Sequence, residues 1–265
     1  SVATLFATGA LATAALAADL PNIRVLATGG TIAGAQASAT DYGYKSGAYD
    51  VNSLLKAVPN LDKLAVITGE QIASIGSQDM NDAVWLNLAK RANQLLATPE
   101  VDGIVVTHGT DTLEETAYFL NLVITSDKPV VLVGSMRPAT STSPDGPLNL
   151  YNAVAVAADP GARGLGVLVV SNDDLFAARE IQKTNTTDLQ TFISPNRGQL
   201  GEAYYGKVRY FHMPTTRHTT KSEFSLAGLE AMPRVDIVYS HENADGAMVE
   251  AAVAAGAKGI VLAGV

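Results

Sequence analysis

The fold is decided by two segments, IRVLATGGTIAG (Ile23 to Gly34) and GIVVTHGTDTLEETAYFL (Gly103 to Leu120). Each is a short run of apolar, mostly β-branched residues that ends abruptly in threonine, glycine and other small residues. In open parallel α/β sheets, ligands bind at the carboxyl ends of the strands, so both segments are predicted to lead into a site. Thr31 and Thr110 therefore stand where a hydroxyl could attack a substrate, and Asp111 follows one of them.

Strands and helices alternate outward from these two segments, which predicts an α/β fold with a mostly parallel sheet covered by helices. Thr112 and Glu115 form a capping-box pattern for the helix that starts at Glu114, and Asp79 or Asn81 could cap the preceding helix. The apolar patterns predict strands over residues 24–28, 64–68, 104–107, 130–134 and 165–171, and helices over 51–58, 83–97, 114–123 and 148–158.

The composition changes over residues 211–233, FHMPTTRHTTKSEFSLAGLEAMP, which resembles a linker. A strand, a helix and a strand are predicted beyond it, over 235–240, 244–255 and 259–265. A parallel strand rarely ends a domain without a covering helix, because both faces of a parallel sheet need burial. We therefore expect a larger N-terminal domain over 19–211, a linker over 212–234, and the start of a smaller, incomplete C-terminal α/β domain over 235–265.

The composition excludes several classes of function. The chain has 265 residues, of which 47% are apolar and 17% are charged, as in ordinary globular proteins. A net charge of −8 argues against nucleic acid as a partner, because that function requires basic patches. The absence of cysteine excludes thiol nucleophiles and thiolate zinc sites, and the four histidines form no HExxH pattern, so no metal site is expected.

Residues 1–18, SVATLFATGALATAALAA, carry no charge and are rich in alanine. Ala15-Leu16-Ala17 matches the small-x-small pattern of a signal-peptidase site. We interpret the segment as a partial signal peptide of an exported protein that has no membrane partner once the leader is removed. The alternative is a buried, alanine-rich helix.

Each candidate site residue also has an ordinary structural explanation. The glycines at 29, 30 and 34 do not fit a dinucleotide fingerprint, and no Walker lysine or G-x-S-x-G elbow is present. From the residues alone, Thr31 could be a turn residue, Asp111 a helix cap and His108 a packed, hydrogen-bonding residue. By the same reasoning Tyr44 would be a loop aromatic, Lys183 a surface charge, and Ser77-Gln78-Asp79 a turn and cap.

Six segments of the chain form one ordered set of motifs: LATGGTIAG, GSQDMND, THGTDTLEETAYFL, VGSMRP, DGPLNLYNAV and KTNTTD. Taken together, they resemble the motifs of the bacterial type II L-asparaginases, and the resemblance covers essentially the whole chain after the leader. ATGGTIAG and THGTDT match the two signature segments of that family.

The resemblance implies hydrolysis of L-asparagine to L-aspartate and ammonia through a threonine acyl-enzyme, without a cofactor. Thr31 matches the nucleophile, and Tyr44 matches the loop tyrosine that helps to accept its proton, with Tyr42 as a neighbouring tyrosine in the same loop. Thr110, Lys183 and Asp111 match a second triad that orients or activates the hydrolytic water.

The resemblance also implies how the substrate is held. Ser77 and Gln78 match positions that clamp its α-carboxylate and α-ammonium groups, with Asp111 also on the ammonium and with Thr110 and Gly30 completing the contacts. Gln78 indicates a preference for asparagine over glutamine, although one methylene discriminates by only about 1–3 kcal/mol.

The resemblance further implies a periplasmic protein that, when full length, forms a homotetramer, a dimer of dimers. In that family the smaller domain supplies an asparagine and a glutamate to the active site of a neighbouring subunit. Those positions have no counterpart among these residues, so low activity is expected of the 265-residue chain. The alternatives are a glutaminase-asparaginase of broad specificity and, from another class, a periplasmic amino-acid-binding protein.

Overall fold

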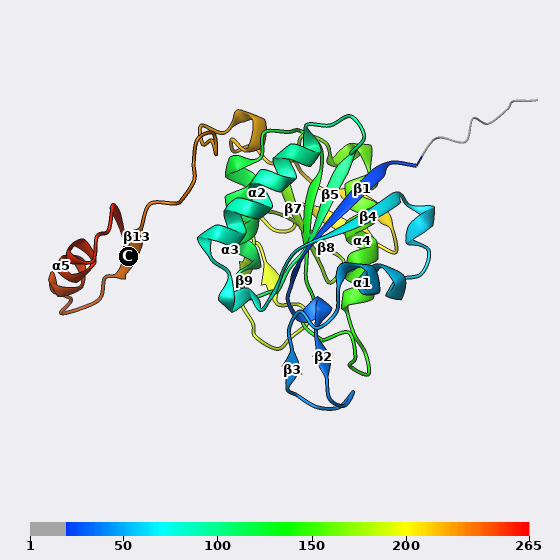
Figure 1. Ribbon diagram of the computed structural model, residues 1–265, viewed down its shortest axis with the longest axis horizontal. Coiled ribbons are helices and arrows are strands. Elements are labelled where there is room, and N and C mark those ends of the chain that lie inside the picture. Colours follow the sequence, from blue (N-terminus) through cyan, green and yellow to red (C-terminus); the bar gives the residue numbers. More distant parts are fainter. Residues whose placement is uncertain (1–19, 265) are drawn as a thin grey trace, which may run out of the picture.

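The structure is a computed structural model that describes residues 20–264 (Figure 1). The predicted signal peptide lies outside the described residues. A central sheet of eight strands has the order β12-β11-β8-β7-β6-β5-β1-β4. Neighbouring strands from β4 to β7 run parallel, and β7, β8, β11 and β12 pair antiparallel. The strands are β1 (Asn22–Gly29), β4 (Val66–Ile75), β5 (Gly103–Thr107), β6 (Val130–Val133), β7 (Val167–Ser171), β8 (Asp174–Ala177), β11 (Gly201–Tyr204) and β12 (Lys207–Tyr210).

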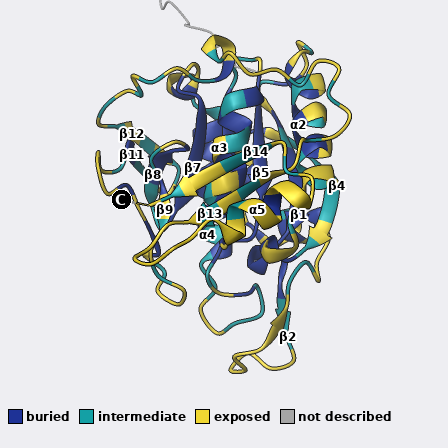
Figure 2. Cartoon of the chain, turned by 90° about the vertical axis from the view of Figure 1, so that its left-hand side faces the viewer, coloured by how far each residue is buried: buried dark blue, intermediate teal, exposed yellow. Residues whose placement is uncertain are grey.

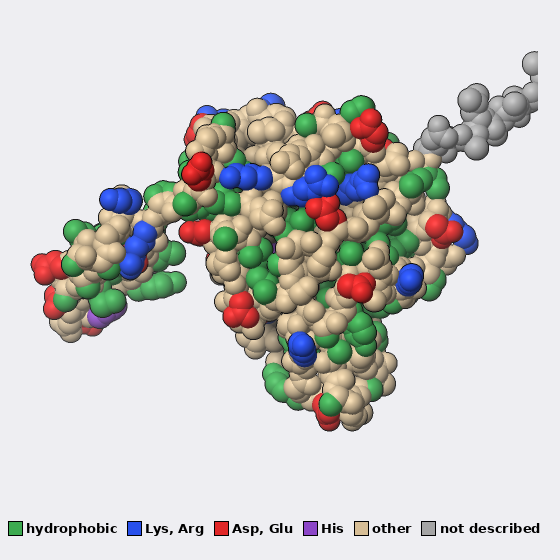
Figure 3. Space-filling model, in the orientation of Figure 1, with side chains coloured by type: hydrophobic (Ala, Val, Ile, Leu, Met, Phe, Trp, Pro, Cys, Tyr) green, Lys and Arg blue, Asp and Glu red, His purple; other side chains and the backbone are tan. Residues whose placement is uncertain are grey.

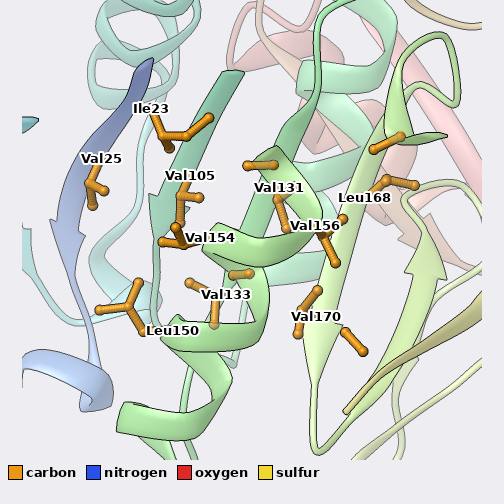
Figure 4. Close-up of a cluster of buried hydrophobic side chains, with 14 of the residues drawn as sticks. Ile23, Val25, Val105, Val131, Val133, Leu150, Val154, Val156, Leu168 and Val170 are labelled. Carbon is orange, nitrogen blue, oxygen red and sulfur yellow. The ribbon is translucent and has the colours of Figure 1, made fainter. Parts of the chain in front are cut away.

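Helices cover both faces of this sheet, which confirms the predicted α/β architecture. Successive residues of a strand point to opposite faces. Val105 of β5 accordingly packs in the cluster under α4, and Val106 packs in the cluster under α2 and α3. Figure 4 shows Val105 and Val131 facing Val154 of α4. The helices are α1 (Val51–Ala57), α2 (Asp82–Leu96), α3 (Leu113–Val123) and α4 (Gly146–Ala158).

The antiparallel edge of the sheet was not predicted. β7 turns into β8 through Asn172 and Asp173, whose φ angles are 52° and 68°. Asparagine and aspartate tolerate this left-handed region, which a two-residue hairpin turn needs. They are, however, a weaker sequence signal for such a turn than glycine. β4 also continues to Ile75, well beyond the predicted end at Thr68, because it pairs with the whole length of β1.

The two predictions of helix caps had opposite outcomes. Asn81 caps α2, because its Oδ1 accepts a hydrogen bond from the Val84 N–H at 3.2 Å. The capping box at Thr112 was wrong. The Thr112 hydroxyl instead donates to the Ser77 carbonyl at 2.8 Å, and no side chain caps α3. A tertiary acceptor thus replaces the local one.

Smaller elements complete the chain. β2 (Ala35–Gln36) and β3 (Tyr44–Lys45) form a hairpin that projects below the sheet in Figure 1, and β9 (Gln182–Lys183) pairs with β10 (Phe192–Ile193). The short 3-10 turns are η1 (Thr31–Ala33), η2 (Leu61–Lys63), η3 (Ser77–Asp79), η4 (Pro160–Ala162) and η5 (Thr219–Lys221). Within residues 20–264, no helix is long and apolar enough to span a membrane.

Residues 211–234 contain only η5, and part of this segment packs on the main body: Thr219 is buried, and the Lys90 ammonium donates to the Leu229 carbonyl at 2.6 Å. β13 (Val235–Tyr239), α5 (Ala247–Ala254) and β14 (Gly259–Ala263) follow as a βαβ unit with parallel strands. Most residues of this unit are exposed (Figure 2), and Figure 3 shows apolar side chains on its surface. Its exposed large apolar side chains include Ile237, Tyr239 and Leu262.

Candidate active site

A cavity of about 640 Å³ opens at the carboxyl ends of β1 and β5. Thr31, Tyr44, Thr110, Asp111 and Lys183 all line it. These side chains come from four separate parts of the chain, and all five were predicted as catalytic residues. The rest of the lining comes from Gln36 of β2, from the loop between β2 and β3, from residues 136–143 and from residues 186–187.

The two strand ends meet through glycine. Gly30 has a φ of +78°, and a β-carbon on it would lie 2.3 Å from the Gly109 backbone nitrogen. No side chain fits there, so the turn after β1 and the turn after β5 lie in direct contact. The Gly30 N–H donates to the Ile75 carbonyl at 2.8 Å, and Gly30 does not line the cavity. Its backbone therefore packs the two turns together, and its N–H is engaged in that bond.

The first pair of reactive groups is Thr31 and Tyr44. Thr31 is buried in η1, directly after the glycine turn, and its Oγ1 lies 2.6 Å from the Tyr44 Oη. Tyr44 belongs to β3 of the hairpin and is 44% exposed. Neighbouring Tyr42 is 91% exposed. Tyr44 is thus the tyrosine that reaches the Thr31 hydroxyl.

The second group is Thr110, Asp111 and Lys183. The Lys183 Nζ lies 2.9 Å from the Thr110 Oγ1 and 2.6 Å from the Asp111 Oδ1. The Lys183 side chain is 11% exposed, whereas that of Asp111 is 59% exposed. The ammonium is therefore held inward, and the Asp111 carboxylate retains room to meet a second cation in the cavity.

Glu114 anchors this lysine and was not predicted. Its carboxylate accepts a hydrogen bond from the Lys183 backbone N–H, which ties β9 to the first turn of α3. A glutamate in the first turn of a helix is ordinarily explained by the helix dipole. The second role of Glu114, the bond to the Lys183 backbone, depends on a tertiary contact that the local sequence does not show.

The predicted substrate clamps lie beside the cavity and are not among its lining residues. Ser77 is buried, and its Oγ accepts a hydrogen bond from the Asp111 N–H at 3.1 Å. Gln78 follows it in η3 and is exposed. Ser77 therefore fixes the backbone that presents Asp111, and Gln78 stands next to that contact.

His108 is a packed, hydrogen-bonded residue, as the interpretation from the residues alone predicted. It is fully buried, with Nδ1 2.7 Å from the Gly109 carbonyl and Nε2 2.9 Å from the Thr116 hydroxyl. The Trp85 Nε1–H donates to the same hydroxyl at 2.7 Å. Burial lowers the pKa of His108 from 6.5 to about 4, so its ring is neutral at pH 7. Within residues 20–264, no group of three or more histidine, aspartate or glutamate side chains could hold a metal ion.

The fold and the cavity define an α/β protein with two threonine hydroxyls at adjacent strand ends, one bonded to a tyrosine and the other to a lysine. Comparison with known proteins agrees with this class. The family described as "Asparaginase, N-terminal" matches residues 22–216, and the chain belongs to the asparaginase family.

Individual relatives match nearly the whole chain. The "Probable L-asparaginase periplasmic" of Haemophilus influenzae is 52% identical over 265 residues, which are 100% of this chain and 75% of that protein. "L-asparaginase 2" of Bacillus subtilis is 56% identical over 93% of this chain and 66% of its own length. The crystal structure of "Probable Cytoplasmic L-asparaginase from Campylobacter jejuni" has a TM-score of 0.89 and 48% identity, covering 92% of this chain and 75% of that chain. Proteins with these names are amidohydrolases.

Proposed function

We propose that this protein hydrolyses L-asparagine to L-aspartate and ammonia through an acyl-enzyme on Thr31. Family membership and the names of the relatives support the reaction. The observation that carries the mechanism is the pairing of hydroxyls in one cavity: Thr31 with Tyr44 at 2.6 Å, and Thr110 with Lys183 at 2.9 Å.

In the first step, the Thr31 Oγ1 attacks the side-chain amide carbon of asparagine. A threonine hydroxyl is a weak nucleophile and needs a positioned base, which is worth roughly 10²–10⁴ in rate. Tyr44 is the group in hydrogen-bond contact with that hydroxyl, so it takes the proton and passes it to the leaving nitrogen. Ammonia departs, and an aspartyl ester remains on Thr31.

In the second step, water attacks the ester carbon and the bond from that carbon to the Thr31 Oγ1 breaks. A proton from the water returns to the Thr31 Oγ1, and aspartate leaves. Thr110 and Lys183 lie in the same cavity and form the arm that orients this water. Asp111 binds the α-ammonium of the substrate through its exposed carboxylate, while its other contact holds the Lys183 ammonium. Ser77 supports this arrangement because its Oγ accepts a hydrogen bond from the Asp111 N–H.

The proposal extends to location and assembly. The leader-like residues 1–18 and the relative named periplasmic support export, whereas the similar crystal structure is named cytoplasmic. Cell fractionation with and without residues 1–18 tests export, and recovery of both forms in the cytoplasm would contradict it. A homotetramer is tested by light scattering of the purified protein, and a monomer at micromolar concentration would contradict it.

The activity is tested by ammonia release from L-asparagine with the wild-type protein and with Thr31→Ala. The expected result is slow but measurable turnover by the wild type, in line with the low activity expected of the 265-residue chain, and its loss in the variant. A periplasmic amino-acid-binding protein would instead bind asparagine stoichiometrically and release no ammonia. Turnover that survives in Thr31→Ala would contradict the assignment of the nucleophile.

A further inference from the structure

Asp145 immediately precedes α4 but does not cap it. An aspartate in this position ordinarily accepts hydrogen bonds from the first free N–H groups of the helix. Here its Oδ2 accepts from the Met136 N–H at 2.9 Å and its Oδ1 accepts from the Arg137 N–H at 2.9 Å, and the carboxylate accepts from none of the first backbone N–H groups of the helix. Asn149, one turn into α4, donates to Oδ2 at 3.2 Å and orients the carboxylate.

The segment that Asp145 holds, residues 136–143, lines the cavity and is bonded to the loop that follows Thr31. The Ala139 N–H donates to the Gly34 carbonyl at 3.1 Å. The Thr140 Oγ1 accepts from the Gln36 N–H at 2.8 Å, and the Thr142 hydroxyl donates to the Ala39 carbonyl at 3.3 Å. Segment 136–143 therefore supports one side of the β2–β3 hairpin.

The hairpin in turn carries Tyr44. Gln36 of β2 pairs directly with Tyr44 of β3, so the residue that Thr140 holds is the partner of the tyrosine. Two-stranded hairpins are only marginally stable alone, and this one has just two residues in each strand. Backbone bonds from Gly47 to Gly30 and from Tyr49 to Ala33 fasten its return strand only beyond Tyr44.

We propose that Asp145 is a positioning residue for the reaction. Its carboxylate fixes segment 136–143, which holds the hairpin so that the Tyr44 Oη stays against the Thr31 Oγ1. The inference rests on the proposed function. It explains why a helix-capping residue turns away from its helix, and a displacement of about 1 Å at a reacting group can cost roughly 10²-fold in rate.

The test is a double-mutant cycle of Asp145→Ala with Tyr44→Phe, measured as kcat and KM for asparagine. Asp145→Ala alone should lower kcat by about tenfold with little change in KM. A tenfold loss is expected because a displaced base loses only part of the roughly 10²–10⁴-fold in rate that a positioned base supplies. In the Tyr44→Phe background it should lower kcat by less than about twofold, because the group it positions is already gone. Equal losses in the two backgrounds would overturn the proposal.

Asp159→Ala is the matched control. Asp159 lies at the other end of α4, where its Oδ1 accepts from the Gly161 N–H at 2.8 Å and its Oδ2 accepts from the Tyr210 hydroxyl at 3.3 Å. Its loss removes similar bonds far from the cavity and should leave kcat unchanged. A tenfold loss in this variant as well would attribute the effect to α4 in general and overturn the proposal.

Hydrogen exchange gives a readout that does not depend on activity. Asp145→Ala should speed amide exchange in residues 35–45 and leave residues 103–107 of β5 unchanged. Asp145→Asn, which keeps one acceptor oxygen as an amide carbonyl, should show a smaller effect of the same kind and serves if the alanine variant fails to fold. Absence of ammonia release by the wild type refutes the proposed function alone, whereas unchanged exchange in residues 35–45 refutes the positioning role.

Discussion

Gly30→Ala is the substitution that most directly connects the fold to the chemistry. The new β-carbon would lie 2.3 Å from the Gly109 nitrogen, 2.4 Å from its α-carbon and 2.7 Å from the His108 carbonyl carbon. All three are backbone atoms, so no side chain can rotate away. A left-handed φ costs a non-glycine residue roughly 1–2 kcal/mol, and overpacking adds about 1–3 kcal/mol. We expect the free energy of unfolding to fall by about 2–5 kcal/mol on these grounds.

The effect on catalysis should exceed the effect on stability. Relief of the overlap requires the two strand ends to separate by about 1 Å, and Thr31 follows the substituted residue directly, so kcat should fall by roughly 10²-fold or more. Urea denaturation and ammonia release measure the two quantities. Gly164→Ala is the control, because Gly164 has a φ of +76° with nothing within 4 Å of its β-carbon position. Equal destabilisation in the two variants, with full activity in Gly30→Ala, would refute the argument from close contact.

Three further predictions concern the groups around the cavity. Lys183→Met should lower kcat by about 10²–10⁴-fold, with a burst of one equivalent of ammonia in rapid-quench assays, but should change stability by no more than about 1 kcal/mol because Asp111 is largely exposed. Glu114→Ala should lower kcat and speed amide exchange at residues 182–184, and unchanged exchange there would contradict its anchoring role. The pKa of His108 is about 4 in the folded protein and 6.5 in the unfolded chain. Between these pH values the unfolded chain takes up a proton at His108 and the folded protein does not. The free energy of unfolding should therefore fall by up to about 3 kcal/mol as pH drops from 6.5 to 4. His108→Gln should remove that part of the pH dependence, as urea titrations at pH 4.5 and 7 can measure.

The sequence predicted the centre of the fold well because its signals there are local. The apolar run of residues 104–107 can be buried only between two layers, and β5 is buried along its whole length. The antiparallel strands β8, β11 and β12 were not predicted, because the hairpin at Asn172 that leads into them lacks a glycine. The capping box at Thr112 failed because the Ser77 carbonyl, 35 residues away in sequence, offers a competing acceptor.

The site residues likewise divide into those predicted from local sequence signals and those that depend on contacts distant in sequence. The general rule for parallel sheets brought Thr31 and Thr110 to one edge. The partners of these threonines are separated from them by 13 residues for Tyr44 and by 73 residues for Lys183, and no local pattern encodes such contacts. Only the family resemblance pointed to them. The role of Asp145 was not predicted, because an aspartate before a helix is interpreted as an N-cap from sequence whether or not its side chain bonds to the helix.

The central claim is that Thr31 carries the acyl group, and peptide mapping of the acid-quenched Lys183→Met variant with asparagine tests it most directly. The account predicts one aspartyl group esterified on the peptide that contains Thr31, in an amount equal to the ammonia burst. An aspartyl ester on Thr110, or a burst of ammonia with no ester on Thr31, would contradict it.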